Sequence, residues 1–505
     1  MKILFISPPF YRLQDATLIH YPVSCCSMAA ILEREGYQSL VYNADYDPNK
    51  KTILGNTNHL RTDALVNEHA NYLRRLNDLG DPIWVEVKNF IRDYQPDILG
   101  ISAFNITLTA AHQVAKIAKA LNPRVITLLE GCNNRGIFCA INPAEVADFN
   151  LIDFALTREP ELTVIELVKA LENGETDFSR IDGLAWKKDG QVIKNKDREF
   201  LNDLDSLPFP ARHLIHGYKE MPPHVFQGIY GSRGCPFNCV FCGCHVSCGY
   251  KPRTRTAKNM VNEIELVHKK FGTHYFYVCD DIFFIDKPRA KEFCQILIEK
   301  KLPITWSCQS RAEMLDDETL DLVKMAGGQH IAIGVETGNE RVRAVMKKGN
   351  TLDDVRRCAA IIRKHGLYMV AFVIIGLPWE TAKEIEDTVD FIKEIKPHIV
   401  YPYLATPAPG TELDDMIHED NPQAKSMLKD LCHSDPAAAL SRTIPSAEKV
   451  KVINWALAEF ARFNKRNLFR NLLERPKFYW YFISDMALLK RPKHVMSYIK
   501  DFFAQ

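Results

Sequence analysis

The sequence predicts an α/β protein in three parts: an N-terminal Rossmann-like, doubly wound domain, a partial (β/α)6 barrel and a helical C-terminal region. Short apolar runs alternate with helix-like segments through the first 172 residues, and the alternation resumes near residue 229 with six strand–helix steps. The length of 505 residues suits about three domains. The segments we expect are 1–172 (Rossmann-like domain), 173–228 (linker with a hairpin), 229–415 (barrel) and 416–505 (helical cap).

The first domain is predicted from short, apolar, strand-like runs at 2–7, 38–43, 97–102 and 124–129. Helix-like segments separate them, at 22–35, 64–78, 83–94, 108–121 and 161–172. Ligands of doubly wound folds bind beyond the carboxyl ends of the strands. In this chain those ends are Ser7-Pro8-Pro9, Ser102-Ala103-Phe104-Asn105 and Glu130-Gly131.

The linker contains a predicted β-hairpin at 183–194 that turns at Asp189-Gly190. Beyond it, barrel strands are predicted at 228–232, 274–279, 304–308, 330–335, 369–375 and 399–404. The helices between them are predicted at 257–270, 287–300, 316–326, 351–365 and 381–395. In such a barrel the chemistry lies at the carboxyl ends of the strands.

The composition excludes several classes of protein. Hydrophobic residues make up 46% and charged residues 25%, which is ordinary for a globular protein, and the net charge of +1 gives no global attraction to nucleic acid or membrane. Met1-Lys2 leads straight into a short apolar run, so we expect no signal peptide and a cytoplasmic location. We also expect no transmembrane helix, which needs about 18 apolar residues. The 14 cysteines are then expected to be reduced thiols.

Three of these cysteines form a CxxxCxxC loop at the end of a predicted strand: Cys235, Cys239 and Cys242. Thiolates hold iron–sulfur clusters, and three thiolates on a four-iron cube leave one iron open to a small molecule. The alternatives are unligated core thiols or a zinc site completed by Cys244, His245 or Cys248. Structural zinc usually requires two CxxC pairs or added histidines, so we favour the cluster and expect Cys244 and Cys248 to be bystanders.

Further candidate residues follow the later strands in order. They are Phe241 before the third cysteine, Asp280-Asp281, Arg311, Gly334-Val-Glu336-Thr-Gly338 and Gly376-Leu-Pro-Trp-Glu380. Each alone has a plain structural explanation: Glu336, for example, could be a buried carboxylate paired with Arg311.

In this order and spacing, the motifs over about 225–415 resemble the radical S-adenosylmethionine (SAM) superfamily. The resemblance implies a [4Fe–4S] cluster on the three cysteines that cleaves SAM to a 5′-deoxyadenosyl radical. It also implies a SAM site, in which Phe241 lies beside the adenine, the acidic pair helps to bind the methionine amino group and Arg311 meets the methionine carboxylate. The remaining SAM-site residues implied are Gly334, Glu336 and Gly376.

The first domain resembles the cobalamin-binding domain of a class B-like branch of that superfamily. The residues implied at cobalamin are Ser7, Pro8, Pro9, Ser102, Phe104, Asn105, Glu130 and Gly131. The chain departs from the branch where Gly131-Cys132 replaces Gly-Gly and where Arg158-Glu-Pro160-Glu161 replaces Gly-Glu-Gly-Glu. No Asp-x-His motif is present to ligate cobalt. The alternative is a Rossmann-like domain that holds no cofactor.

The resemblance implies cobalamin-dependent methylation of an unactivated carbon, that is, a methyltransferase. The first alternative is radical oxidation or cyclisation without methyl transfer, as in the anaerobic porphyrin cyclases. The second is a non-catalytic cobalamin carrier or sensor, which would have no use for the cysteine loop. The implied partners are a small-molecule substrate and an electron donor such as flavodoxin or ferredoxin.

The C-terminal region is basic and aromatic. Residues 462–500 hold ten Lys or Arg but only two acids, interleaved with aromatic residues. Such a helix suits a membrane surface or a hydrophobic, polycyclic substrate. The reading we favour is a helical cap that packs its aromatic residues on the barrel. We expect no nucleic acid, because no RNA-binding module accompanies the basic residues.

Overall fold

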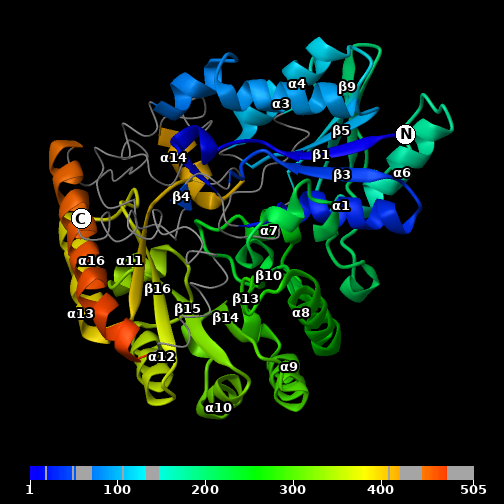
Figure 1. Cartoon of the computed structure of the whole chain (residues 1–505). Coiled ribbons are helices and arrows are strands. Elements are labelled where there is room, and N and C mark those ends of the chain that lie inside the picture. Colours follow the sequence, from blue (N-terminus) through cyan, green and yellow to red (C-terminus); the bar gives the residue numbers. More distant parts are fainter. Residues whose placement is uncertain are drawn as a thin grey trace.

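The computed structural model describes residues 1–17, 20–47, 51–52, 71–104, 107–131, 147–407, 410–420 and 446–474. Two sheets dominate these residues, one of seven strands and one of six. Figure 1 shows the first sheet in blue and cyan and the second in green and yellow, with helices along the outer side of the second. The predicted α/β fold class is confirmed.

The first sheet has the strand order β3-β1-β5-β6-β7-β8-β9. Its strands are β1 (Ile3–Ser7), β3 (Ser39–Asn43), β5 (Ile98–Ser102), β6 (Ile126–Glu130), β7 (Phe154–Leu156), β8 (Leu184–Lys188) and β9 (Gln191–Lys194). The strands from β3 to β7 are parallel. Because the chain goes from β1 to β3 on one side and then to β5 on the other, the topological switch point lies between β1 and β5.

Helices cover both faces of this sheet, as in a doubly wound fold. The helices are α1 (Val23–Arg34), α3 (Pro82–Tyr94), α4 (Leu108–Leu121) and α6 (Glu161–Glu172). Apolar residues of α1 and α6 belong to one hydrophobic cluster, and those of α3 and α4 belong to another. The sheet is therefore buried on both faces, which explains its continuous apolar strands. The predicted helix at 64–78 lies partly outside the described residues.

The predicted hairpin is present and extends the first sheet. Asp189 and Gly190 have φ angles of 52° and 80°, as a two-residue turn with left-handed backbone requires. β8 pairs antiparallel with β7, a three-residue strand that the sequence analysis missed. The hairpin thus adds the last two strands of the sheet, and β9 forms its edge.

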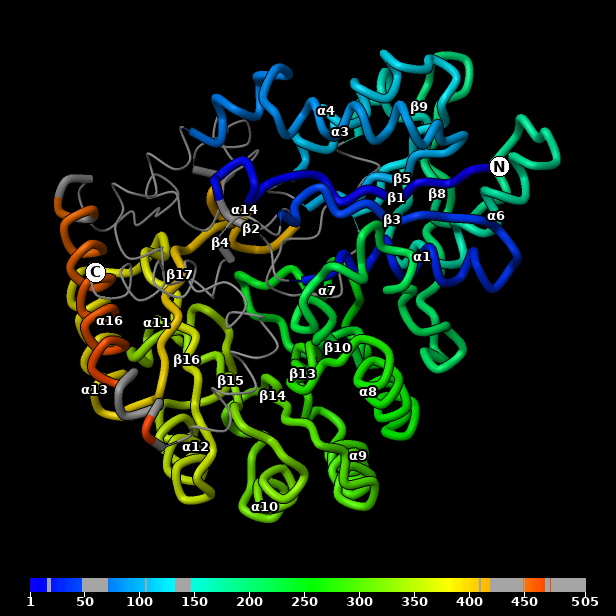
Figure 2. Tube along the Cα trace, viewed as in Figure 1, coloured from blue at the N-terminus to red at the C-terminus, as the bar shows by residue number. Residues whose placement is uncertain are grey.

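The second sheet is parallel, and its strands follow chain order. They are β10 (Gly228–Ile229), β13 (Tyr275–Val278), β14 (Thr305–Ser310), β15 (Gly328–Glu336), β16 (Tyr368–Ile375) and β17 (Ile399–Leu404). The intervening helices are α8 (Ala257–Phe271), α9 (Lys287–Lys300), α10 (Asp317–Met325), α12 (Leu352–Lys364) and α13 (Ala382–Ile395). β10 and β17 form the two edges, so the sheet is the predicted partial barrel. Figure 2 traces its strands and helices in chain order.

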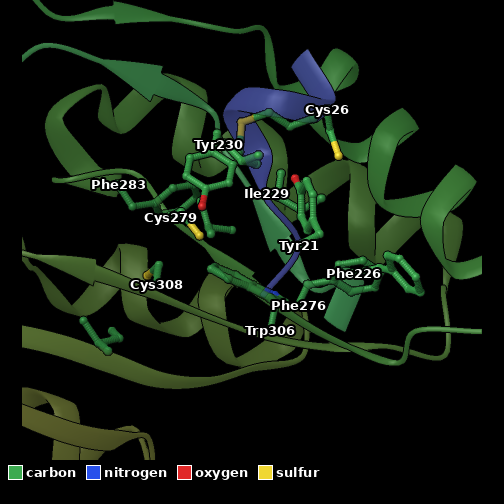
Figure 3. Packing of buried hydrophobic residues seen from close by; sticks show 14 of the residues in the cluster. Tyr21, Cys26, Phe226, Ile229, Tyr230, Phe276, Cys279, Phe283, Trp306 and Cys308 are labelled. Atoms are coloured by element: carbon green, nitrogen blue, oxygen red, sulfur yellow. The ribbon is translucent and has the colours of Figure 1, made fainter. Parts of the chain in front are cut away.

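The two α/β units share one hydrophobic core. Figure 3 shows Tyr21 of the first unit near Phe226 and Ile229 of the second. The Tyr21 hydroxyl donates to the carbonyl oxygen of Gly228 (3.0 Å). Buried Arg212 donates to both of these oxygens (2.8 Å each) and pairs with Glu263 of α8 at 2.7 Å. Apolar burial and a buried cation paired with a buried carboxylate thus hold the two units against each other.

Helix α16 (Ser446–Glu474) contacts α13 and the edge strand β17. The Asn464 side chain accepts from the Val400 N–H and donates to the Val400 carbonyl oxygen, both at 2.8 Å. An edge strand exposes unpaired backbone groups, and this amide satisfies two of them. The predicted cap is therefore present over 446–474, while the aromatic residues beyond it lie outside the described residues. In the part of the chain described, no helix is long and apolar enough to span a bilayer.

Candidate active site

The cysteine loop is closed at its base by a short ladder. β11 (Ser232–Arg233) pairs antiparallel with β12 (Arg253–Thr254), so residues 234–252 form one lobe. Gly234 has a φ of 91°, and a Cβ there would lie 2.5 Å from the carbonyl oxygen of Lys251. Only glycine fits this close, left-handed turn directly before the first cysteine.

The loop is anchored at the carboxyl ends of the second sheet's strands. The Val240 N–H donates to the carbonyl oxygen of Met346 (3.1 Å), just after α11 (Glu340–Val345). The Leu413 N–H, in α14 (Glu412–Asp420), donates back to the Val240 carbonyl (2.9 Å). Two backbone bonds therefore hold the middle of the motif against segments that follow β15 and β17.

The three motif thiols lie in this anchored loop. Cys239 is buried, and Cys235 and Cys242 are half-buried. Burial raises the pKa of Cys239, while the positive charges of Lys348 and Arg311 oppose that rise. Among the described residues, no three His, Cys, Asp or Glu side chains are close enough to hold one metal ion. Thiolates of a four-iron cube each bind a different iron atom, so this donor set of three thiols beside two cations fits such a cluster.

Arg311 lies directly beside the motif. Its Nη1 is 3.7 Å from the Cys239 sulfur, and its guanidinium lies 3.7 Å from the centre of the Phe237 ring. Its other partners are the carboxylate of Glu313 (2.5 Å) and the carbonyl oxygen of Lys348. The guanidinium is thus held in one orientation next to a motif cysteine.

Glu336 is a buried, paired carboxylate, but Arg311 is not its partner. Lys348 donates to its Oε1 at 2.7 Å, and both side chains are less than a tenth exposed. A Cβ at Gly334 would lie 2.2 Å from Glu336 Oε1 and 2.7 Å from the Lys348 Nζ. The glycine of this motif therefore leaves the space that the ion pair occupies.

The two aspartates after β13 have different surroundings. Asp280 is buried, and its two oxygens accept from the Gly231 N–H (2.5 Å) and from Arg289 (2.8 Å). Asp281 Oδ2 lies 2.9 Å from the Cys244 sulfur. Asp280 therefore secures the backbone before the cysteine loop, and Asp281 is the member of the pair that faces the loop.

Cys244 lies outside the motif, yet it contacts a motif residue. It begins the short helix α7 (Cys244–Cys248), where its thiol lies beside Asp281 and is hydrogen-bonded to Cys235. That hydrogen bond lowers the pKa of Cys235 to about 7. The sequence analysis treated Cys244 as a bystander because spacing alone carries no sign of this contact.

Phe241 packs at the carboxyl end of β16. It joins an apolar cluster with Ile374, Leu377 and Trp379. The backbone there is fixed by Glu380, whose Oε2 accepts from the N–H of Gly376 (2.7 Å) and of Leu377 (3.2 Å). The predicted aromatic and the Gly-Leu-Pro-Trp-Glu loop are therefore brought together.

The carboxyl ends of β1, β5 and β6 form a second group of candidate residues, because parallel strands end at one edge. Ser102 lies in register with Glu130, and the Ala103 N–H donates to the Glu130 carbonyl (2.8 Å). The buried Glu130 carboxylate accepts from Ser24 Oγ (2.8 Å). Gly131 is buried here, as are Pro8 and Pro9; Ser7 and Phe104 are half-buried. The predicted Asn105 and Cys132 lie outside the described residues.

The Arg158-Glu-Pro160-Glu161 segment contacts the cysteine loop, which the sequence analysis did not anticipate. Glu161 Oε1 accepts from Arg233 at 2.5 Å, and Glu159 accepts from Arg253 at 2.7 and 2.9 Å. All four side chains are less than a tenth exposed. The arginines are the two paired residues at the base of the lobe. An arginine two positions before Cys235 was the available signal, but the sequence could not name its partner.

Comparison with known proteins relates this chain to a described family. A model described as the radical SAM superfamily matches residues 229–392. An uncharacterized methyltransferase from Pyrococcus horikoshii is 30% identical over 66% of this chain and 72% of its own length. The anaerobic magnesium-protoporphyrin IX monomethyl ester cyclase from Rubrivivax gelatinosus is 27% identical over 82% of this chain and 69% of its own.

The solved structures give the same fold. The radical S-adenosylmethionine methyltransferase TsrM from Kitasatospora setae, with cobalamin and a [4Fe–4S] cluster bound, superposes with a TM-score of 0.63 at 15% identity. The match covers 83% of this chain and 78% of that protein. It therefore includes both α/β units, in the same arrangement.

Proposed function

This chain belongs to the radical SAM superfamily, and from that premise we propose that Cys235, Cys239 and Cys242 hold its [4Fe–4S] cluster. When bound, such a cluster supplies the electron that breaks a carbon–sulfur bond of SAM and yields a 5′-deoxyadenosyl radical. The observation that carries this proposal is the anchored loop, which holds three thiols at the carboxyl ends of the second sheet beside Arg311.

The chain's own residues would bind and orient SAM next to that loop. Arg311 offers a fixed cation to the methionine carboxylate, and Asp281 offers an acceptor to its amino group. Glu336, held by Lys348, is placed for the ribose hydroxyls. Phe241 provides an apolar face for the adenine. Gly334 leaves room for the Glu336–Lys348 ion pair, and the Gly376 N–H is held by Glu380. Asp280 would support the site indirectly, because it accepts from the Gly231 N–H just before the cysteine loop.

We propose further that the edge formed by β1, β5 and β6 binds cobalamin. Ser7, Ser102 and Glu130 lie at or beside the switch point, and hydroxyl and carboxylate groups fit the amide-bearing rim of a corrinoid. The other residues proposed at this edge are Pro8, Pro9, Phe104, Asn105 and Gly131. Cobalamin, when bound, would carry the methyl group that is transferred. No aspartate precedes any histidine by two residues, so the protein offers no Asp-x-His ligand to the cobalt.

The function we propose is cobalamin-dependent radical methylation of an unactivated carbon, with a one-electron donor such as flavodoxin or ferredoxin. The methyltransferase relative and the TsrM fold support it. The second candidate is radical oxidation or cyclisation, favoured by the likeness to the cyclase over 82% of this chain. A carrier or sensor is disfavoured, because it has no need of an anchored loop of three thiols.

Anaerobic reconstitution with iron and sulfide tests the cluster. We expect a reducible four-iron spectrum that is lost in Cys239→Ala. The spectrum should be kept in Cys294→Ala, because Cys294 is a buried thiol of α9 outside the CxxxCxxC motif. A spectrum that survives in Cys239→Ala would show that the ligands are assigned wrongly.

Two more measurements separate the candidate functions. When the protein is titrated with cobalamin, the absorbance spectrum of the cobalamin should change until one equivalent per protein chain has been added. An unchanged spectrum would refute the cobalamin site. In turnover with a reductant and substrate, methylation yields both S-adenosylhomocysteine and 5′-deoxyadenosine. Oxidation or cyclisation yields 5′-deoxyadenosine without S-adenosylhomocysteine.

A further inference from the structure

The inner face of the second sheet carries aromatic and amide side chains. Side chains alternate between the two faces of a strand. One set, which includes Phe276, Trp306 and Val400, packs in the core with the surrounding helices. The alternate set points the other way, into the partial barrel: Tyr275, Tyr277, Gln309, His330, Phe372, Ile374, Tyr401 and Tyr403.

Several of these inward side chains lie in the interior of the protein but are only partly buried. Burial raises the pKa of the Tyr277 and Tyr401 hydroxyls. The residues that flank these tyrosines on the same strands, Phe276, Val278 and Val400, are fully buried, so these strands lie inside the protein. Both tyrosines nevertheless keep accessible surface, as do Gln309 and Phe372. We call the inner face of the partial barrel, which the alternate set lines, the lumen.

The lumen has a polar floor. Tyr275 is hydrogen-bonded to Ser307, and Ser307 Oγ lies 2.8 Å from His330 Nδ1. The His330 ring lies 5.3 Å from that of Tyr368, which meets His398 edge-on at 4.3 Å. These contacts lie at the amino-terminal ends of the strands, the ends opposite the cysteine loop.

Above the floor, one wall is aromatic and another carries an amide. Phe372 lies 6.0 Å from Tyr401, with the rings inclined by 29°, and 5.8 Å from Tyr403, with the rings inclined by 63°. On the other wall the Tyr277 hydroxyl donates to Gln309 Oε1 (3.2 Å). The Gln309 amide N–H groups and the tyrosine hydroxyls provide donors and acceptors within a largely apolar surface.

The lumen opens toward the proposed SAM site. Ile374, near the carboxyl end of β16, packs against the same apolar cluster as Phe241 of the cysteine loop. Tyr403 is close enough to Glu336 for that carboxylate to help raise its pKa. A molecule held in the lumen would therefore present one end to the place where SAM is cleaved.

We propose that the lumen binds an uncharged, planar conjugated ring system of the substrate, stacked among Phe372, Tyr401 and Tyr403. Aromatic rings prefer offset or edge contacts with other rings, and this wall offers three such rings. The inward set holds no Asp, Glu, Lys or Arg, so an ionised group there would lose hydration without gaining an oppositely charged partner from these residues. Polar groups on the ring would meet Tyr277 and Gln309. This substrate class rests on the proposed function, because it assigns the lumen to the substrate.

The test compares two neutral probes of matched skeleton: 2-naphthol, which is planar and aromatic, and decahydro-2-naphthol, which is saturated and puckered. Equilibrium dialysis against the full-length, cluster-loaded protein measures both dissociation constants. We expect 2-naphthol to bind about tenfold more tightly, the size that one or two ring contacts give. Phe372→Leu should reduce the preference to about twofold or less, and Phe372→Tyr should restore it.

The control variant is Trp455→Leu, which removes an exposed aromatic residue of α16 and should keep the tenfold preference. Equal affinities for the two probes, or a preference that survives in Phe372→Leu, would overturn the substrate class. SAM cleavage and the cluster spectrum are measured on the same samples. If SAM is cleaved normally but the protein shows no preference for 2-naphthol, only the substrate class is refuted. If the protein prefers 2-naphthol but forms no cluster, only the proposed function is refuted.

Discussion

Glu161, the first residue of α6, accepts a 2.5 Å hydrogen bond from Arg233, two residues before the first motif cysteine. Both side chains are less than a tenth exposed. The contact joins residues 72 positions apart and links the first sheet's last helix to the base of the cysteine loop. With the Glu159–Arg253 pair beside it, the segment between β7 and α6 holds both strands of that base.

Replacing Glu161 with Gln should loosen the cysteine loop. Loss of the Glu161 charge leaves buried Arg233 with Glu159, whose Oε1 lies 3.4 Å from its Nη1, as a remaining carboxylate partner. The cost should therefore stay below the about 3–5 kcal/mol of a buried pair that is broken completely. We expect a lower iron content after reconstitution and a severalfold faster loss of the cluster to a chelator, followed by its absorbance. Glu166→Gln is the control, because Glu166 is half exposed and pairs with Arg198 away from the loop. Equal cluster loss in the two variants would contradict this role.

Gly334→Ala should disturb SAM cleavage without removing the cluster. The added Cβ would lie 2.2 Å from Glu336 Oε1 and 2.7 Å from Lys348 Nζ, so the ion pair must move. Misplacement by about 1 Å near reacting groups costs up to about 100-fold in rate. We expect a 10- to 100-fold loss of 5′-deoxyadenosine formation with an unchanged cluster spectrum. Gly80→Ala, on an exposed loop, should leave the rate unchanged.

Glu380→Gln should make the protein more stable at higher pH. Burial raises the pKa of Glu380 to about 8, far above its ordinary value of 4.5. The folded protein therefore keeps a proton that the unfolded chain releases between about pH 4.5 and pH 8. The free energy of unfolding thus falls as pH rises through this window, by at most about 1.4 kcal/mol per pH unit.

The glutamine amide oxygen can still accept from the N–H groups of Gly376 and Leu377, but it does not titrate. Urea unfolding is measured at several pH values from 5 to 8. The free energy of unfolding of Glu380→Gln should rise relative to that of the wild type with each increase in pH. Glu386→Gln, on the exposed face of α13, is the control and should run parallel to the wild type. A constant difference for Glu380→Gln across this range would contradict the raised pKa.

Asn464→Ala should destabilise the edge of the second sheet. Its amide makes two 2.8 Å hydrogen bonds to the Val400 backbone, and the loss should cost about 1–3 kcal/mol in urea unfolding. Asn467→Ala removes one longer bond, 3.2 Å to the Pro397 carbonyl, and should cost less. A deletion of 446–505 would remove Asn464 and its contact with β17, so it could not separate a role of the C-terminal tail in activity from a loss of stability. A deletion of 475–505 keeps this contact.

The sequence by itself determined the fold class and most element positions, because hydrophobic periodicity, caps and turns are local signals. Capping boxes at Thr351 and Thr381 begin α12 and α13, which begin within one residue of the predicted starts. It also located the cysteine loop, because the chemistry of three closely spaced thiols can be read from their spacing. β7 escaped prediction because three residues are too few to show a period.

Only the tertiary structure decided which charges pair and which side chains share a space. Glu336 pairs with Lys348 rather than Arg311, Glu161 reaches Arg233, and Cys244 contacts Cys235. The alternation of Tyr401 and Tyr403 was visible in the sequence, but its meaning was not. A two-residue period says that side chains share a face, whereas the arrangement of the strands as a partial barrel decides that this is the inner face, on the side of the lumen.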